Sequence, residues 1–150
     1  GSTIFFNKRI FNKNKGFDDN FFLYWEETDY TKRALKNGYP AYQLNKVKVH
    51  HEKGKAVQVK NDTEKEKLIN LYSWHFIWSK FYFHKKHYGK IFSYIYFLPI
   101  LVRILFRILY YKTIKDKRFI KYYYRWDGLV NSILEKKSFM RLSGIKLDII

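Results

Sequence analysis

Hydrophobic and polar residues alternate in short stretches over the first sixty residues, a pattern typical of β-strands separated by short helices. Three stretches are predicted as strands or extended segments: Thr3 to Asn7, Phe21 to Trp25 and Tyr42 to His51. Two helices are predicted between them: Lys8 to Asn14 and Thr28 to Asn37. Gly38 and Pro40 follow the second helix, the usual arrangement at a helix C-terminus. A loop around Gly54 completes this part.

After residue 60, hydrophobic residues recur at the spacing of about three to four residues that is typical of a helix. Three segments are predicted to be helical: Asn61 to His87, Ile91 to Tyr111 and Lys117 to Lys136. Asn61 or Thr63 would cap the first of them, and Glu64 or Glu66 would complete a capping box. The chain therefore divides into a mixed part, residues 1–60, and a helical part, residues 61–150.

The segment from Ile91 to Tyr111 carries only two charges, Arg103 and Arg107. Its length would allow a membrane span, but the two arginines and Pro99 argue against a simple one. At helical spacing both arginines fall on one stripe with aromatic residues, and aliphatic residues occupy the rest of the circumference. We therefore expect this helix to lie in or dip into the membrane interface. The alternative is a core helix that packs against another domain.

Composition and charge narrow the classes of function. The chain has 47% hydrophobic and 21% aromatic residues, which excludes general disorder, and it lacks cysteine, which excludes disulfides and thiolate metal sites. A net charge of +17 requires an anionic partner. Between Lys80 and Arg125 there are twelve Lys or Arg residues and one acid, Asp116. This basic region suits an anionic membrane surface.

Three carboxylates, Glu26, Glu27 and Asp29, follow directly after an apolar run that ends at Trp25. Such a cluster is either a site for proton transfer or an ordinary helix N-terminus, where acidic side chains offset the helix dipole. Trp25 would stack on an acceptor sugar or simply pack at the strand end.

Histidines are the other candidate ligands in the sequence. Strand periodicity places His51 on the same face as Val47 and Val49. There His51 would be either a ligand of a cation or a buried histidine at the end of the strand. His84 and His87 have no third ligand nearby in sequence and are predicted to be exposed.

The order of these residues resembles the second half of the catalytic domain of inverting family 2 glycosyltransferases. The matching elements are Gly16-Phe17-Asp18-Asp19, the stretch from Phe21 to Asp29, then Arg33, Gly38-Tyr39 and Val47 to His51. Downstream, the aromatic and basic stretch from Trp74 to His87 is similar to the helix that follows the catalytic domain in many bacterial members. The resemblance covers most of the chain and weakens after about Gly89.

The resemblance implies a role for each candidate residue. Glu27 falls on the position of the general base, where the family usually has Asp, so Glu26 remains an alternative. Asp29 would orient the site, and Trp25 would contact the acceptor. His51 would help to hold the Mg²⁺ or Mn²⁺ ion that neutralises the diphosphate of the donor.

The resemblance further implies a mixed α/β fold: the C-terminal part of a GT-A Rossmann-like catalytic domain in residues 1–60, followed by a helical, membrane-associating region in residues 61–150. The chain has no Asp-any-Asp motif and no glycine-rich phosphate loop, so a donor-binding half is expected outside it, and these residues alone are expected to be inactive. The expected partners are a nucleotide-sugar donor, a saccharide or lipid-linked acceptor and an anionic membrane.

By this interpretation the parent enzyme works at the cytoplasmic face of the bacterial inner membrane, as a peripheral or monotopic protein that builds a surface polysaccharide or glycolipid. Two other functions remain open. Basic residues interleaved with aromatic ones also fit a nucleic-acid-binding module, although no nucleic-acid signature is present and none is expected as a partner. A membrane-anchoring segment without catalysis is the third.

Overall fold

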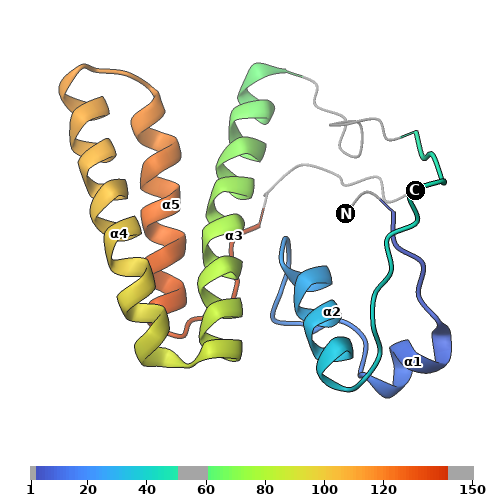
Figure 1. Ribbon diagram of the computed structural model, residues 1–150. Helices are drawn as coiled ribbons and strands as arrows, with labels where there is room; N and C mark the ends of the chain where they lie inside the picture. Colours follow the sequence, from blue (N-terminus) through green and yellow to red (C-terminus); the bar gives the residue numbers. More distant parts are fainter. Residues whose placement is uncertain (1–2, 51–60, 142–150) are drawn as a thin grey trace.

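A computed structural model describes residues 3–50 and 61–141 of the chain. The described residues form five α-helices: α1 (Lys8–Lys13), α2 (Glu26–Lys36), α3 (Asp62–Tyr88), α4 (Lys90–Thr113) and α5 (Arg118–Ile133). Figure 1 shows α3, α4 and α5 side by side, running up and down, while α1, α2 and the extended segments lie on the other side of α3. Helices α3, α4 and α5 form a bundle, and α3 is the member of it that faces the part that carries the candidate carboxylates.

The bundle has a small apolar core to which all three helices contribute. The buried residues of this core come from α3, α4 and α5: Ile77, Phe81, Phe97, Ile104 and Leu129. The rings of Phe81 and Phe97 meet edge to face with centroids 5.1 Å apart, a favourable geometry for aromatic pairs. Burial of each such side chain stabilises the fold by about 1.5–3 kcal/mol, so these five residues hold α4 and α5 against α3.

Helix α5 approaches α3 very closely at Gly128. A Cβ atom added to Gly128 would lie 2.5 Å from the carbonyl oxygen of Trp74 and 3.1 Å from Cγ2 of Ile77. Polar contacts hold the helices at this distance, since the Trp74 indole donates a hydrogen bond to Asp127 at 2.7 Å and the Ser132 hydroxyl donates to the Trp78 carbonyl at 3.0 Å. Only a residue without a side chain fits at position 128.

The Gly128→Ala variant is therefore expected to be less stable by about 1–2 kcal/mol. Overpacking costs up to about 3 kcal/mol, and the better helix propensity of alanine returns about 1 kcal/mol of it. Urea denaturation monitored by tryptophan fluorescence measures the difference. Lys121→Ala, a substitution in the same helix that removes no close contact, serves as the control and should change stability by less than about 0.5 kcal/mol. Equal stability of the two variants would contradict the close approach.

A second cluster, made of aromatic rings, lies between α1 and α2. The rings of Phe6, Phe11, Phe17 and Tyr30 lie with centroids 5.0 to 5.8 Å apart. Helix α1 begins where the Asn7 side chain accepts hydrogen bonds from the next turn, an ordinary N-cap. This cluster fixes the segment before α1 against the inner face of α2.

The predicted α/β Rossmann-like fold is wrong for this chain. The described residues contain no strand, and helix is the only regular secondary structure among them. Residues 3–7 and 39–50 follow an extended path without regular structure, although their alternating pattern is that of strands. A strand is stable only when its peptide groups pair with a neighbour, and no neighbouring strand is present in the described ranges.

Helix positions were predicted more successfully than strands. Helices α1, α3, α4 and α5 confirm the predicted helices to within three residues at each end. Asn61 caps α3 as expected, because its side chain accepts a hydrogen bond from the Glu64 amide at 2.9 Å. Helix α2 begins at Glu26 instead of Thr28, and all three candidate carboxylates belong to its first turn.

Residues 134–141, the C-terminal segment, return along α3 towards the N-terminal part. The Ser138 hydroxyl donates to the Asn20 carbonyl at 2.9 Å, and Nε2 of His75 on α3 lies 2.8 Å from the Met140 carbonyl. The Arg141 guanidinium lies over the Phe22 ring, 3.7 Å from its centroid. The C-terminal segment thus joins α3 to the loop that precedes the candidate carboxylates.

The buried His75 side chain makes the stability of this junction depend on pH. His75 is fully buried, and its burial lowers the pKa of the imidazole to about 4, against the opposing effect of the hydrogen bond to Met140. The unfolded chain, with the ordinary histidine pKa of 6.5, therefore binds more protons than the folded chain between pH 6.5 and pH 4.

The contribution of the buried, neutral His75 to the free energy of unfolding is therefore fully present above pH 6.5 and is lost as the pH falls towards 4. We expect the free energy of unfolding to drop by about 2 kcal/mol between pH 8 and pH 5, measured by urea denaturation. His75→Phe should remove this part of the pH dependence, whereas His50→Phe, at an exposed position, should keep it. The same slope in His75→Phe as in the wild type would contradict the assignment.

Candidate functional site

The candidate carboxylates follow a tight turn with an unusual backbone. Tyr24 and Trp25 both adopt the left-handed region, with φ of 64° and 71°. Residues other than glycine rarely do so, at a cost of about 1–2 kcal/mol each. The turn is fixed on both sides, because the Asp29 amide donates to the Trp25 carbonyl at 2.8 Å and the Ser79 hydroxyl of α3 donates to the Leu23 carbonyl at 2.7 Å. Two strained residues in succession therefore determine where α2 begins and where its first side chains point.

Trp25 lies against an aromatic surface of α3. Its ring centroid is 5.0 Å from that of Phe83, 5.8 Å from His84 and 6.4 Å from Phe76. Phe76 is exposed, Trp25 and His84 are half-buried and Phe83 is buried, so a sugar ring could stack only on the exposed part of this set. We call Trp25, Phe76, Phe83 and His84 the aromatic surface.

Glu26 and Glu27 occupy the first turn of α2, immediately after Trp25. Both are half-buried. One carboxylate oxygen of Glu26, Oε2, is inaccessible to solvent and has no hydrogen-bond partner within the described residues. A carboxylate beside an aromatic surface has the chemistry needed to accept a proton from a sugar hydroxyl.

Asp29 has different surroundings from its two neighbours. Its carboxylate is fully buried and accepts hydrogen bonds from Arg33 Nε, Lys86 Nζ and His87 Nε2, each at 2.8 Å. The Arg33 guanidinium also donates to the carbonyl groups of Asn14 and Gly16. With its oxygens taken up by these donors, Asp29 is suited to hold α2 in place on α3, and unsuited to receive a proton from an acceptor.

Asp18 belongs to the same set of charges. Lys86 Nζ donates to Asp18 Oδ2 at 2.7 Å, the Tyr82 hydroxyl donates to the same oxygen at 3.0 Å, and Asn20 donates to Oδ1. Burial alone would raise the pKa of Asp18, but the hydrogen bonds from Lys86 and Asn20 outweigh it and bring the pKa to about 2. The same balance of burial against Lys86, Arg33 and His87 lowers the pKa of Asp29.

Five side chains thus form one network of ion pairs and hydrogen bonds, which we call the Asp29 network: Asp18, Asp29, Arg33, Lys86 and His87. The network joins the loop before α2, α2 itself and the C-terminal end of α3. Its effect is to fix the position of Glu26 and Glu27 relative to α3.

His84 and His87 are partly buried rather than exposed as predicted. The His87 side chain is 12% exposed and bonds to Asp29, while His84 Nδ1 lies 2.7 Å from the Lys80 carbonyl. Burial lowers the pKa of both imidazoles, and for His87 the hydrogen bond to Asp29 opposes this effect. The signal in the sequence was their spacing with Phe76, Lys80 and Phe83, which places all of them on the face of α3 that meets α2.

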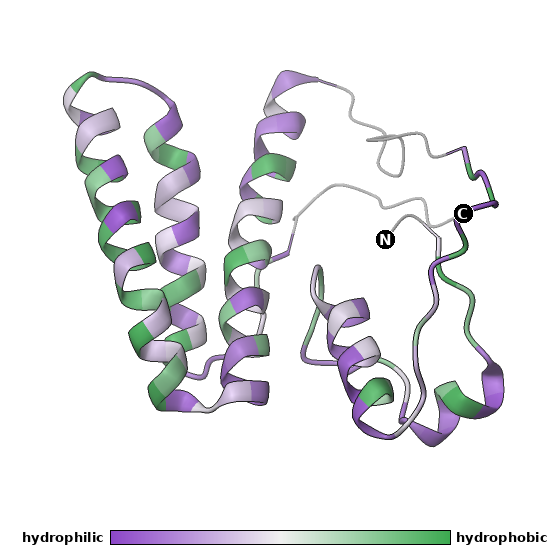
Figure 2. Ribbon diagram, in the orientation of Figure 1, coloured by the Kyte–Doolittle hydropathy of each residue, from purple (hydrophilic) through white to green (hydrophobic). Residues whose placement is uncertain are grey.

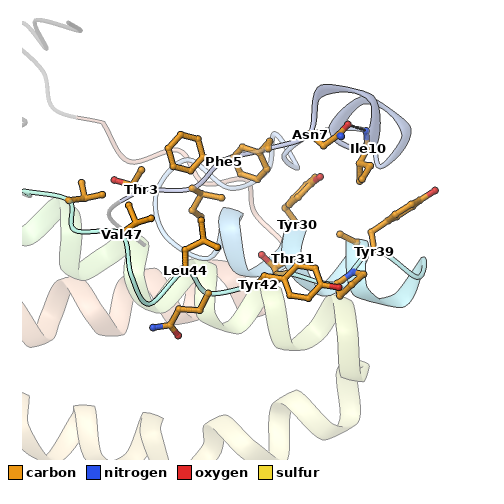
Figure 3. Close-up of a pocket in the computed structure, with 17 residues that line it drawn as sticks. Thr3, Phe5, Asn7, Ile10, Tyr30, Thr31, Tyr39, Tyr42, Leu44 and Val47 are labelled. Atoms are coloured by element: carbon orange, nitrogen blue, oxygen red, sulfur yellow. Dashed lines mark hydrogen bonds between the residues drawn. The ribbon is translucent and has the colours of Figure 1, made fainter.

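A groove lies between the N-terminal extended segment, the side of α2 that carries Tyr30, and residues 39–49, with a volume of about 700 Å³ (Figure 3). Aromatic rings of Phe5, Tyr30, Tyr39 and Tyr42 line it together with aliphatic and uncharged polar side chains. No charged residue lines the groove, so it offers nothing to neutralise a diphosphate. None of the three candidate carboxylates contributes to it, and it is distinct from the turn at Trp25.

The predicted metal ligand, His51, lies outside the described residues. Within residues 3–50 and 61–141, no group of three or more His, Asp or Glu side chains could hold a metal ion. The two acids of the Asp29 network are neutralised by Lys86 and Arg33, so they do not fit a cation site.

Helix α4 is long and apolar enough, by length and composition, to cross a membrane. Its apolar residues extend along the whole helix (Figure 2), and many lie outside the bundle; Ile91 is 77% and Phe106 is 70% exposed. Arg103 is exposed as predicted. Arg107, also exposed, donates a hydrogen bond to the Tyr122 hydroxyl of α5, with its guanidinium carbon 5.1 Å from the centre of that ring. The Arg107 side chain on α4 therefore contacts α5.

Comparison of the chain with protein-family models, with curated proteins and with solved structures found no match to any of them. Function must therefore be argued from the residues and their geometry.

Proposed function

We propose that these residues are the C-terminal part of an inverting family 2 glycosyltransferase, which transfers a sugar from a nucleotide-diphospho-sugar to a saccharide or lipid-linked acceptor during synthesis of a surface polysaccharide or glycolipid. One observation carries the proposal. The left-handed turn at Tyr24 and Trp25 presents Glu26 and Glu27 beside the aromatic surface, and the Asp29 network holds that turn on α3.

In the proposed reaction Glu27 is the general base. The acceptor hydroxyl attacks the anomeric carbon of the donor sugar from the face opposite the diphosphate, and its proton passes to the Glu27 carboxylate. A new glycosidic bond forms as the bond to the diphosphate breaks, so the nucleoside diphosphate leaves with the bonding electron pair and the anomeric configuration inverts. Trp25 supports the acceptor ring, and Asp29 acts through the backbone of α2 as a positioning residue.

The donor would be bound mainly by residues outside this chain, because the Asp-any-Asp motif that the resemblance calls for is not present in the sequence. The same resemblance implies Mg²⁺ or Mn²⁺ as the cofactor. The described acids do not fit a metal site, and we therefore derive no step through a metal ion.

The decisive experiment is an assay of nucleoside-diphosphate release by the full-length parent. A panel of nucleotide sugars is offered with a bacterial membrane lipid extract and Mn²⁺, and release is compared with and without the extract. Release that depends on both one donor and the extract is the expected result. No release from any donor by a folded, membrane-bound protein would overturn the proposal.

The proposed location is the cytoplasmic face of the bacterial inner membrane, with the protein peripheral or monotopic. Three observations support it: the exposed apolar side of α4, its exposed Arg103, and the excess of basic residues from Lys80 to Arg125. At about 1.5 Å per residue α4 matches the thickness of a bilayer, yet its arginines and its contacts with α5 suit a helix lying at the interface.

We expect the protein to sediment with vesicles that contain phosphatidylglycerol and to be released as salt is raised. Each lysine or arginine near an anionic surface contributes about 1 kcal/mol, and salt screens this attraction. Neutral phosphatidylcholine vesicles and a single-stranded oligonucleotide serve as the comparisons. Binding indifferent to anionic lipid, or tighter binding to the oligonucleotide, would contradict the membrane assignment.

A further inference from the structure

Two stretches of extended chain, residues 3–6 and 40–49, border the uncharged groove, and we call them the edge segments. Both contribute side chains to the groove (Figure 3). No backbone hydrogen bond joins either edge segment to another part of the chain that the structure describes. An extended segment of this kind presents a row of peptide N–H and C=O groups that can pair with a strand from another chain.

Apolar side chains on the edge segments are exposed in the groove. Tyr42, Leu44, Val47 and Val49 line it, and each of them is more than half exposed. Phe5, on the other edge segment, is 82% exposed. A strand that enters the groove would cover this apolar surface while its peptide groups pair with an edge segment. Main-chain hydrogen bonds and contacts of alternate side chains are the two contributions that bind an added strand in β-augmentation.

Lysines on the second edge segment indicate which residues such a strand would carry. Lys46 and Lys48 are exposed and do not line the groove, whereas Val47 and Val49, which alternate with them, do line it. In an extended chain this alternation places the lysines and the valines on opposite faces. Opposite charges on facing residues of neighbouring strands stabilise the pair, and like charges destabilise it. A complementary strand therefore has acidic residues on the face of the lysines and apolar residues on the face of the valines.

The same charges argue against a second copy of this chain as the occupant. If residues 46–49 of two copies paired, lysines of one copy would lie beside lysines of the other. The whole chain has a net charge of +17, which also disfavours self-association.

We propose that the groove binds an extended segment of another protein in which apolar and acidic residues alternate. The apolar side chains of this segment lie against Leu44 and Val47, its acidic side chains lie beside Lys46 and Lys48, and its peptide groups pair with an edge segment. Strand structure thus arises at the groove only in the complex. The interaction is independent of glycosyl transfer, because the groove is distinct from the turn at Trp25.

The test is binding of synthetic peptides to the 150-residue chain, measured by isothermal titration calorimetry. The probe is a capped peptide of four valine–glutamate repeats. Three comparison peptides each change one feature: lysine replaces glutamate, or four valines precede four glutamates without alternation, or the backbone is N-methylated and lacks N–H donors. Only the probe is expected to bind. Its carbonyl groups, labelled with ¹³C, should then show the infrared amide band of a paired strand.

Variants of the groove test where the probe binds. Leu44→Asp should weaken binding at least about tenfold, because it replaces an apolar contact in the groove by a negative charge. Leu109→Asp on α4 is the matched control, since Leu109 and Leu44 are both 63% exposed, and it should bind like the wild type. Lys48→Glu should weaken binding of the probe about two- to tenfold and should allow the valine–lysine peptide to bind.

Several results would overturn the proposal. They are no binding of the probe at millimolar concentration, equal affinity for the probe and any comparison peptide, an equal loss of affinity in Leu44→Asp and Leu109→Asp, and an unchanged peptide preference in Lys48→Glu. A dimer of the free chain that is detected by light scattering and abolished by Leu44→Asp would assign the groove to a second copy, and would overturn it as well.

Discussion

By the proposed mechanism, replacing Glu27 by Gln in the proposed full-length glycosyltransferase is expected to lower the rate of sugar transfer by about 10²–10⁴-fold, the usual contribution of a positioned general base. Gln has nearly the same shape and cannot take the proton of the acceptor hydroxyl. The loss of a negative charge at the start of α2 costs at most about 1 kcal/mol, so the variant should fold. The measurement is nucleoside-diphosphate release at saturating donor, compared with the wild type.

Glu26→Gln is the matched variant, since it makes the same change one residue earlier in the same helical turn. It should retain most of the activity, because Glu26 is assigned no proton transfer. Asp19→Asn, at an exposed position outside the site, controls for the loss of one negative charge. Full activity in Glu27→Gln with loss of activity in Glu26→Gln would move the base to Glu26. Full activity in both would exclude a carboxylate base from this turn.

Asp29→Asn is expected to reduce the free energy of unfolding by about 3–5 kcal/mol, because removal of one partner from a buried ion pair leaves the others without compensation. Asn keeps the shape of Asp but leaves Arg33, Lys86 and His87 facing an uncharged amide. Since α2 is held on α3 largely through this carboxylate, the variant should also lose the fixed position of the turn at Trp25. Urea denaturation followed by tryptophan fluorescence reports both effects.

The Asp29 network also predicts how acid destabilises the protein. The pKa of Asp29 is lower in the folded chain than its ordinary value of 3.8, so its contribution is present above pH 3.8 and is lost as the pH falls through the folded value. Asp29→Asn should therefore be less sensitive to pH in this acidic range than Asp19→Asn. An Asp29→Asn variant as stable as Asp19→Asn would show that the network contributes nothing.

Most of the helical structure could be predicted from local signals in the sequence. Asn61 is followed by Glu64, and this capping pattern was enough to place the start of α3 correctly. The strands could not be predicted in the same way, because alternation in residues 3–7 and 42–50 describes which side chains share a face and not whether a partner strand exists. Residues 3–7 and 42–50 are consequently extended but unpaired, and Phe21 to Trp25, also predicted as a strand or extended segment, end in a left-handed turn.

The surroundings of the candidate carboxylates could be predicted only in part from the sequence. The three carboxylates were recognised from their spacing, but the difference between Asp29 and its neighbours depends on Lys86 and His87, which lie more than fifty residues later in the sequence. Nothing local distinguishes these two from the other basic residues of α3. Likewise, the left-handed backbone at Tyr24 and Trp25 has no signature in the sequence, because neither residue is a glycine or an asparagine.

The path of the C-terminal segment has a consequence for the order in which the protein matures. Ser138 and Met140 hold the loop before α2 against α3, yet they are synthesised more than a hundred residues after that loop. During translation Glu26 and Glu27 therefore leave the ribosome long before the contacts that fix them exist. The carboxylates reach their final position only when synthesis of this region is nearly complete and α4, the helix suited to the membrane, has already emerged.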